Sequence, residues 1–178
     1  AASDCIECAA GKYIDVAGSD EAADCIDCVA GKYLHTTGGS AASDCIECAA
    51  GKYIDVAGSD EEADCIICGA GKFSEVGSSV CLDCAAGQYQ DVQEQGECIS
   101  CPVGKYQENQ GETSCSKCLP GQYQDSTGEP SCINCAVGKY SAEESNAVAD
   151  CINCGAGKHS STTPISESEC IACVAGKY

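Results

Sequence analysis

Cysteine is the residue in this chain whose type and spacing could support chemistry. Its 20 copies all fall into ten Cys-x-x-Cys pairs, which begin 16 to 20 residues apart. Two thiols at this spacing could act as a redox dithiol, bind zinc together with a neighbouring pair, or form structural disulfides. The pairs begin at Cys5, Cys25, Cys45, Cys65, Cys81, Cys98, Cys115, Cys132, Cys151 and Cys170.

The redox and zinc interpretations depend on what surrounds each pair. A redox dithiol stands near a βαβ pattern, whereas these pairs lie in short segments interrupted by glycine. Two neighbouring pairs would provide the four ligands of a zinc site. However, every internal pair has two equally good neighbours, and a glycine directly after the second cysteine, which favours a metal knuckle, occurs only at Gly69 and Gly155. Zinc-thiolate binding is kept as an alternative to disulfides.

Disulfides between successive pairs follow from the direction of the side chains. In an extended Cys-x-x-Cys segment the two cysteines point to opposite sides, so one reaches the preceding loop and the other the following loop. Each closed loop is worth on the order of 3 kcal/mol in the chain-entropy model. Cys5 and Cys173 would pair outside the segment. The expected bonds are Cys8–Cys25, Cys28–Cys45, Cys48–Cys65, Cys68–Cys81, Cys84–Cys98, Cys101–Cys115, Cys118–Cys132, Cys135–Cys151 and Cys154–Cys170.

The amino-acid composition indicates a chain that is held together by cross-links and that lies outside the cytosol. The sequence has no Trp or Met and one Phe, and much of its 44% hydrophobic fraction is Ala and Cys. Such side chains bury too little area to offset the backbone entropy of folding. This density of cysteine predicts an oxidising, extracellular compartment. Because the chain has no secretory signal segment, we expect it to be part of a longer secreted or cell-surface protein.

Charge and hydropathy exclude two classes of partner. The net charge is −19, from 28 acidic residues against nine lysines. Nucleic acids and anionic membrane surfaces both require positive charge. No apolar run approaches the ~18 residues of a membrane helix, so we expect no membrane insertion within this segment.

Each cysteine pair begins a repeat with a fixed glycine and a fixed ring. Two residues separate the second cysteine from the glycine, and one residue separates the glycine from the ring. We expect Gly11 to adopt a positive φ, a short strand to follow from Lys12, and a second turn to form near Gly18. Comparable second-turn glycines are Gly38, Gly58, Gly77, Gly96, Gly111 and Gly128. The ring slot holds Tyr13, Tyr33, Tyr53, Phe73, Tyr89, Tyr106, Tyr123, Tyr140, His159 and Tyr178.

These features predict a small disulfide-rich fold, mostly β or irregular, built as an elongated tandem-repeat solenoid or rod of ten short hairpin units. We expect one continuous array about 100 Å or more long, with the rings stacked along one side. The aliphatic residue after each first cysteine, such as Ile6 or Ile26, should pack against a neighbouring ring. The repeats span 1–24, 25–44, 45–64, 65–80, 81–97, 98–114, 115–131, 132–150, 151–169 and the incomplete 170–178.

The pattern Cys-x-x-Cys-x-x-Gly-Lys-Tyr, followed by a glycine turn and another cysteine, resembles the ephrin-receptor-like cysteine-rich repeat. It is more distantly similar to the cysteine-rich modules of TNF receptors and growth-factor receptors. Proline usually precedes the turn glycine in these modules, and here it survives only at Pro102 and Pro120. The resemblance implies tandem arrays in extracellular proteins, including large surface proteins of algae and other protists.

The expected function is structural. An enzyme needs a clustered acid, base or nucleophile, and the two histidines, His35 and His159, lie in different repeats; we therefore expect no catalytic residue, no cofactor and no metal site. The carboxylates could hold Ca²⁺ weakly, but their spacing is not that of an EF-hand. Near-identical repeats favour a segment of a long surface appendage or filament, with a ligand-binding or adhesive receptor ectodomain as the alternative.

The expected partners are further repeats of the same chain and copies of itself in a filament. No Asn-x-Ser/Thr sequon occurs, although hydroxyl clusters such as Ser160–Thr163 could carry O-linked glycans.

Overall fold

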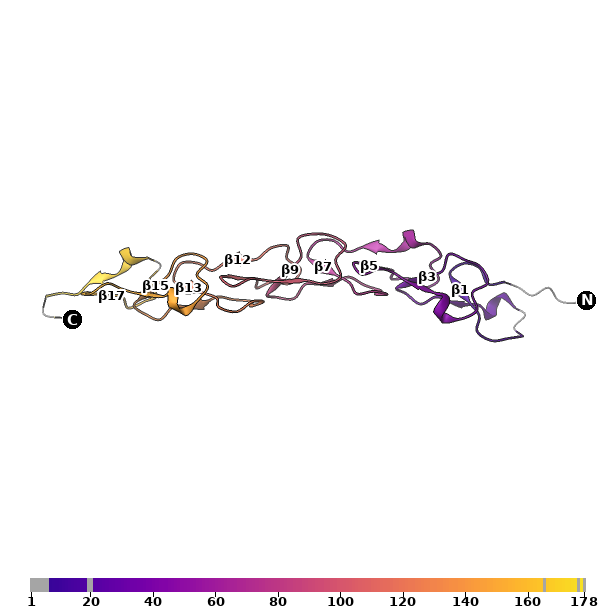
Figure 1. The fold of residues 1–178 in the computed structure, drawn as a ribbon, viewed down its shortest axis with the longest axis horizontal. Coiled ribbons are helices and arrows are strands. Elements are labelled where there is room, and N and C mark those ends of the chain that lie inside the picture. Colours follow the sequence, from indigo (N-terminus) through magenta and orange to yellow (C-terminus); the bar gives the residue numbers. More distant parts are fainter. Residues whose placement is uncertain (1–6, 19–20, 165, 176, 178) are drawn as a thin grey trace, which may run out of the picture. The chain divides into compact units, whose positions relative to one another are not determined.

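The computed structural model describes residues 7–18, 21–164, 166–175 and 177. Within these ranges the chain forms nine two-stranded hairpins and five one-turn 3₁₀ helices, with no α-helix (Figure 1). This confirms the small, disulfide-rich fold of tandem short hairpins. The chain divides into two compact units: unit 1 comprises Ala1–Asp83 with Val92–Glu97, and unit 2 comprises Cys84–Asp91 with Cys98–Tyr178.

Each hairpin joins the ring strand of one repeat to the residues between the two cysteines of the next repeat. In the first hairpin, Lys12 lies opposite Asp27 and Tyr13 lies opposite Ile26. The antiparallel pairs in unit 1 are β1 (Lys12–Tyr13) with β2 (Ile26–Asp27), β3 (Lys32–Tyr33) with β4 (Ile46–Glu47), β5 (Lys52–Tyr53) with β6 (Ile66–Ile67), and β7 (Lys72–Phe73) with β8 (Leu82–Asp83).

The same pairing continues in unit 2. Its hairpins are β9 (Gln88–Tyr89) with β10 (Ile99–Ser100), β11 (Lys105–Tyr106) with β12 (Ser116–Lys117), β13 (Gln122–Tyr123) with β14 (Ile133–Asn134), β15 (Lys139–Tyr140) with β16 (Ile152–Asn153), and β17 (Lys158–His159) with β18 (Ile171–Ala172). Each strand is only two residues long. The strand expected over residues 12–16 stops early because the backbone N–H of Ile14 donates to the carbonyl of Gly39 in the next repeat.

The turn that enters each hairpin requires its glycine. Gly11 has a φ of +81°, and the N–H of Lys12 donates to the carbonyl of Ala9 at 3.2 Å, which is the arrangement of a turn with glycine in its third position. Gly11 is also buried against the backbone of Gly58, two repeats later, where a Cβ atom would overlap the Gly58 carbonyl. Two constraints therefore select glycine: a positive φ and a close backbone approach.

A second turn in each repeat bonds back to the repeat before it. The N–H of Gly38 donates to the carbonyl of Cys8 at 2.8 Å, and Gly58 donates to Cys28 at the same distance. The expectation for Gly96 is wrong: Glu94, with a φ of +61°, occupies this position and donates to Cys68 at 3.0 Å. The turn lies three or four residues after a buried side chain in every described repeat where this bond is seen, so packing sets its position rather than the glycine.

Five loops contain a 3₁₀ helix between the second turn and the next cysteine. All five loops close over 16 or 17 residues, whereas the loops of 13 or 14 residues contain none. The additional residues of a long loop therefore form one helical turn. The helices are η1 (Ala22–Asp24), η2 (Ala42–Asp44), η3 (Glu62–Asp64), η4 (Val148–Asp150) and η5 (Glu167–Glu169).

The interior consists of half-cystines and one side chain per repeat. The second cysteine of a pair is nearly inaccessible, as in Cys28 and Cys84. In seven repeats the residue directly after the ring is also buried, as in Leu34 and Ile54. The aliphatic residues after the first cysteines are not part of this interior, because they are 39% to 60% exposed in the described repeats where they occur. They lie opposite the preceding ring across the hairpin, as Ile26 lies opposite Tyr13, but their side chains stay largely in solvent.

Candidate functional site

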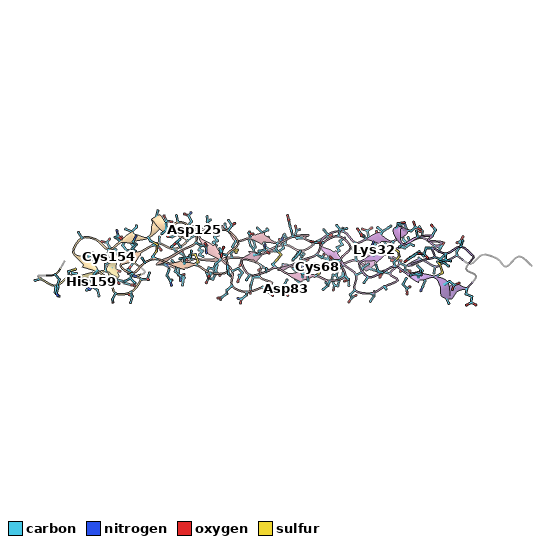
Figure 2. All side chains as sticks on the ribbon, turned by 90° about the horizontal axis from the view of Figure 1, so that it is seen from below. Lys32, Cys68, Asp83, Asp125, Cys154 and His159 are labelled. Atoms are coloured by element: carbon cyan, nitrogen blue, oxygen red, sulfur yellow. A yellow bond between two sulfur atoms is a disulfide. The ribbon has the colours of Figure 1, made fainter. Side chains whose placement is uncertain are left out.

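Nine disulfides are the chemically distinctive feature of the structure. Each joins the second cysteine of one pair to the first cysteine of the next, with Cα atoms 5.6 to 5.8 Å apart, within the usual range for such bonds. Figure 2 draws their sulfur atoms in yellow and labels Cys68 in unit 1 and Cys154 in unit 2. Cys5 lies outside the described residues, and Cys173 has a free thiol.

These bonds join the same residues that the spacing leads us to expect. They are Cys8–Cys25, Cys28–Cys45, Cys48–Cys65, Cys68–Cys81, Cys84–Cys98, Cys101–Cys115, Cys118–Cys132, Cys135–Cys151 and Cys154–Cys170. Because the thiolate is the form of cysteine that binds a metal, these 18 oxidised residues provide no thiolate ligand for zinc.

The ring of one repeat packs on the disulfide of the next. Tyr13 contacts the cluster formed by Cys28, Cys45 and Leu34. In the same register, Tyr33 packs with the Cys48–Cys65 bond and Ile54. The rings of Tyr13 and Tyr33 therefore pack on disulfides and not on each other. Within the described part of the chain, the ring pair in contact is Tyr33 with His35, at 6.4 Å between centroids. Tyr178 lies outside the described residues.

Backbone hydrogen bonds interlock consecutive repeats. The N–H of Cys28 donates to the carbonyl of Gly11, and the N–H of Gly11 donates to the carbonyl of Leu34, both at 2.8 Å. Equivalent bonds join Cys118 to Gly104 and Gly104 to Gln124 in unit 2. Since backbone atoms make these bonds, the bonds themselves do not depend on which side chains the repeats carry.

The residue after the ring is the buried position that sequence reasoning missed. It is Leu34 or Ile54 in two repeats, and in the next five repeats it is a polar residue with at most 7% exposure. The polar examples are Ser74, Gln90, Gln107, Gln124 and Ser141. A signal was present, because this slot never holds a charged residue although charged residues make up 21% of the chain. Burial of an unpaired charge is costly, so the absence of charge marks the interior.

Comparison with known families identifies the kind of repeat. A family model described as "Tyrosine-protein kinase ephrin type A/B receptor-like" matches residues 71–103 and 92–131. The same order of cysteine pair, turn glycine, ring and disulfide continues on both sides of the matched residues. The matched residues are ephrin-receptor-like cysteine-rich repeats, and the nine disulfides of the described residues follow the same repeated pattern. Such repeats are those of an extracellular or secreted repeat protein or a receptor-like ectodomain, and they are typically non-enzymatic. No curated protein matches the chain.

Ion pairs lie on the exposed surface of the hairpins. In the first two hairpins the lysine before the ring faces an acidic residue of the next pair, with Lys12 Nζ 2.7 Å from Asp27 Oδ1 and Lys32 Nζ 3.2 Å from Glu47 Oε1. Lys52 instead contacts Glu94, because Ile67 occupies its cross-strand position. All these side chains are partly or largely exposed, so each pair contributes little to stability.

A second cluster of charge lies in unit 2. Glu144 contacts both Lys117, at 3.0 Å, and Lys105, at 3.3 Å. The hydrogen bond from Lys117 holds the pKa of the Glu144 carboxyl below its ordinary value, with Lys105 adding to the effect. The same bond raises the pKa of Lys117. Glu144 has a positive φ of +62° at a second turn, so these contacts tie that turn to both strands of one earlier hairpin, β11 with β12.

Histidines and carboxylates do not gather into a site in the described part of this ephrin-receptor-like array. His35 is exposed beside Tyr33, and His159 Nδ1 lies 3.8 Å from Cys173 Sγ. No group of three or more His, Cys, Asp or Glu that could hold a metal ion is found in residues 7–18, 21–164, 166–175 and 177. Over the same ranges, no helix has the length and apolar character needed to cross a bilayer.

Proposed function

We propose that this chain is a structural repeat protein that forms a segment of a long extracellular appendage or filament. The observation that carries the proposal is the way in which repeats depend on one another. Backbone bonds and a disulfide join one repeat to the next, Tyr13 and Tyr33 add ring contacts, and in six repeats the turn glycine lies against the backbone of the next repeat but one. A single repeat of this kind is not stable alone, and each added repeat stabilises its neighbours.

The partners in this proposal are further repeats of the same chain and copies of the chain itself. Repetition supports this choice, since residues 1–20 are identical to residues 41–60. A binding site for a single ligand needs a distinctive surface, whereas an extended assembly needs the same surface many times. Surface charge of −19 keeps such an assembly soluble and limits lateral association to conditions in which salt screens the charge.

A ligand-binding or adhesive receptor ectodomain is the alternative, and one observation favours it. Ile67 replaces the polar or charged residue found at most equivalent positions, and it is 47% exposed. Together with Tyr53 and Val80, it lines an open hollow of about 390 Å³ in unit 1. This surface is distinctive in the way that a ligand-binding site requires.

Imaging and solution scattering test the structural proposal. Electron microscopy of the native material should show periodic filaments labelled by antibodies raised against the chain. The purified chain in solution should have a radius of gyration well above about 16 Å, the compact-domain value for its length. A compact monomer on native cell surfaces, with no periodic assembly, would favour the ectodomain alternative.

A further inference from the structure

The hairpin of β5 and β6 carries two exposed isoleucines in succession. Ile66 and Ile67 are 48% and 47% exposed. Ile67 is the only aliphatic residue larger than alanine at the second position between the cysteines of any pair. In the preceding repeat this position holds Glu47, which forms an ion pair with Lys32. The β5–β6 hairpin therefore exposes apolar area where most other repeats have a polar or charged residue.

Each of the two isoleucines lines an open hollow in unit 1. Successive side chains of a strand point to opposite faces, and the two isoleucines accordingly line different hollows. Ile66 and Val56 line one of about 440 Å³, and Ile67 and Val80 line one of about 390 Å³. Asp55 lines both hollows, so the two share one carboxylate. We call Asp55, Val56, Ile66, Ile67 and Val80 the isoleucine face.

The charge around the isoleucine face is negative and is not neutralised by nearby lysines. Residues 54–81 contain six acidic residues and one lysine, Lys72, whose ammonium group pairs with Asp83 outside this stretch. The carboxylate of Asp55 is exposed, and it makes no hydrogen bond or ion pair with another described residue. The face therefore combines two apolar hollows with a carboxylate that is available to a cation.

We propose that the isoleucine face docks a basic segment of another protein. In this segment an arginine or lysine pairs with Asp55 and lies between two aliphatic side chains, one for each hollow. Burial of the aliphatic side chains supplies most of the affinity, and the charge-assisted hydrogen bond to the carboxylate selects a cationic partner. The docking site goes beyond the structural function, and it does not depend on filament formation.

Charge complementarity favours another protein over a second copy of this chain. The chain has a net charge of −19 and no arginine. Seven of its nine lysines form ion pairs within the described residues of the chain itself. A second copy would therefore bring carboxylates against the carboxylates of the face, and like charges across an interface are costly. A partner with free cationic side chains meets no such repulsion.

The test uses the full 178-residue chain with its disulfides intact and three synthetic peptides. The probe is Gly-Leu-Ser-Arg-Ser-Leu-Gly with a fluorophore at its N-terminus. One reference peptide has glutamate in place of arginine, and the other has serine in place of both leucines. Fluorescence anisotropy measures the three affinities, and NMR chemical-shift changes locate the bound probe. The probe should bind about tenfold more tightly than either reference peptide, with its shift changes on the isoleucine face.

Two pairs of variants separate docking at this face from general attraction to an acidic chain. Ile67→Ser introduces the residue type that Ser100 supplies at the equivalent position, and it should weaken probe binding about tenfold. Its control, Ile152→Ser, changes an isoleucine that is 54% exposed in unit 2 and should leave binding unchanged. Asp55→Asn should weaken binding several-fold at low salt and much less at high salt. Asp15→Asn, an exposed aspartate with the same neighbouring residues, is its control.

Several results would overturn the proposed docking site. Absence of probe binding, or equal binding of either reference peptide, would show that the face does not read both the cation and the aliphatic side chains. Equal losses of affinity in Ile67→Ser and Ile152→Ser would place the probe elsewhere on the acidic surface. Sedimentation velocity tests the remaining occupant: self-association of the chain that Ile67→Ser removes would assign the face to a second copy and overturn the choice of a basic partner.

Discussion

Two kinds of loop hold the same disulfide register by different means. The loops closed by Cys28–Cys45 and Cys48–Cys65 span 17 residues, bury Leu34 or Ile54, and end in a 3₁₀ helix. The loops closed by Cys101–Cys115 and Cys118–Cys132 span 14 residues and have no helix.

The short loops replace apolar packing with hydrogen bonds. Gln124 is buried; its Nε2 donates to the carbonyl of Ser131 at 2.7 Å, and its Oε1 accepts from the N–H of Ser126 at 3.0 Å. Gln107 makes the same bonds with Ser114 and Asn109. A glutamine amide thus connects both ends of a loop too short for a helical turn. Both kinds of loop have the same disulfide arrangement, so the disulfides set the geometry of the repeat. The buried side chain only has to suit the length of its own loop.

The largest effect should come from reduction of the disulfides, which both kinds of loop share. Reduction of the disulfides should abolish the fold of the whole chain, because each closed loop loses on the order of 3 kcal/mol of entropic stabilisation and the apolar interior is small. Near-ultraviolet circular dichroism of the tyrosines and NMR dispersion provide the measurement. A chelator alone should change neither signal. Unfolding by the chelator, with resistance to a thiol reductant, would instead support zinc binding.

The long loops should be sensitive to loss of their buried aliphatic side chain. Ile54→Ala should cost about 2 kcal/mol or more in the free energy of unfolding, because it removes a side chain with 1% exposure from the contact with Tyr33 and the Cys48–Cys65 bond. The control Ile46→Ala removes an isoleucine that is 39% exposed and should cost much less. Denaturant titration with disulfides intact measures both. Equal costs would mean that the exposed aliphatic residues, and not the slot after the ring, form the interior.

The short loops should depend on the amide and not on its apolar part. Gln124→Leu keeps the volume but leaves the Ser131 carbonyl and the Ser126 N–H without their partner, at a cost of about 1–2 kcal/mol. Gln122→Leu, which removes an exposed side-chain bond to Asn134, is the matched control and should be close to neutral. The same denaturant titration decides the matter. A neutral or stabilised Gln124→Leu variant would show that apolar packing suffices in both kinds of loop.

The smallest effect should come from the carboxylate of Asp44, the last residue of η2, which caps the start of that 3₁₀ helix. Asp44 Oδ2 accepts from the N–H of Ser40 at 2.7 Å and of Ala41 at 3.1 Å, and these bonds hold the pKa of Asp44 below its ordinary value. Since the folded-state pKa is lowered, the stabilisation is present above the ordinary pKa of about 3.9 and is lost as pH falls through the folded value. Asp44→Ala should therefore be slightly less stable than the parent at neutral pH and equal to it at strongly acidic pH.

Thermal unfolding at several pH values measures this difference. Asp55→Ala removes the same charge from an exposed position in a loop of the same kind and serves as the control. A difference for Asp44→Ala that grows as the pH falls would contradict the capping role.

Sequence alone determined the features that depend on local spacing. The offset of three residues within a Cys-x-x-Cys pair predicts that its side chains point to opposite sides, and the structure has the disulfides expected from that offset. The need for glycine at position 11 could also be predicted, because a tight turn with positive φ depends on only a few adjacent residues. The family type could also be recognised from this spacing.

Only the tertiary structure decided which side chains are inside. Ile26 is hydrophobic and exposed, whereas Gln124 is polar and buried, since burial depends on where the next two repeats place their backbones. The second turn falls on Glu94 and not on Gly96 for the same reason. Contacts between repeats involve residues about 20 to 47 positions apart, as between Gly11 and Gly58, and a window of local sequence contains only one side of such a contact. Tyr13 and Tyr33 therefore pack on disulfides, an arrangement that the spacing of the rings does not reveal.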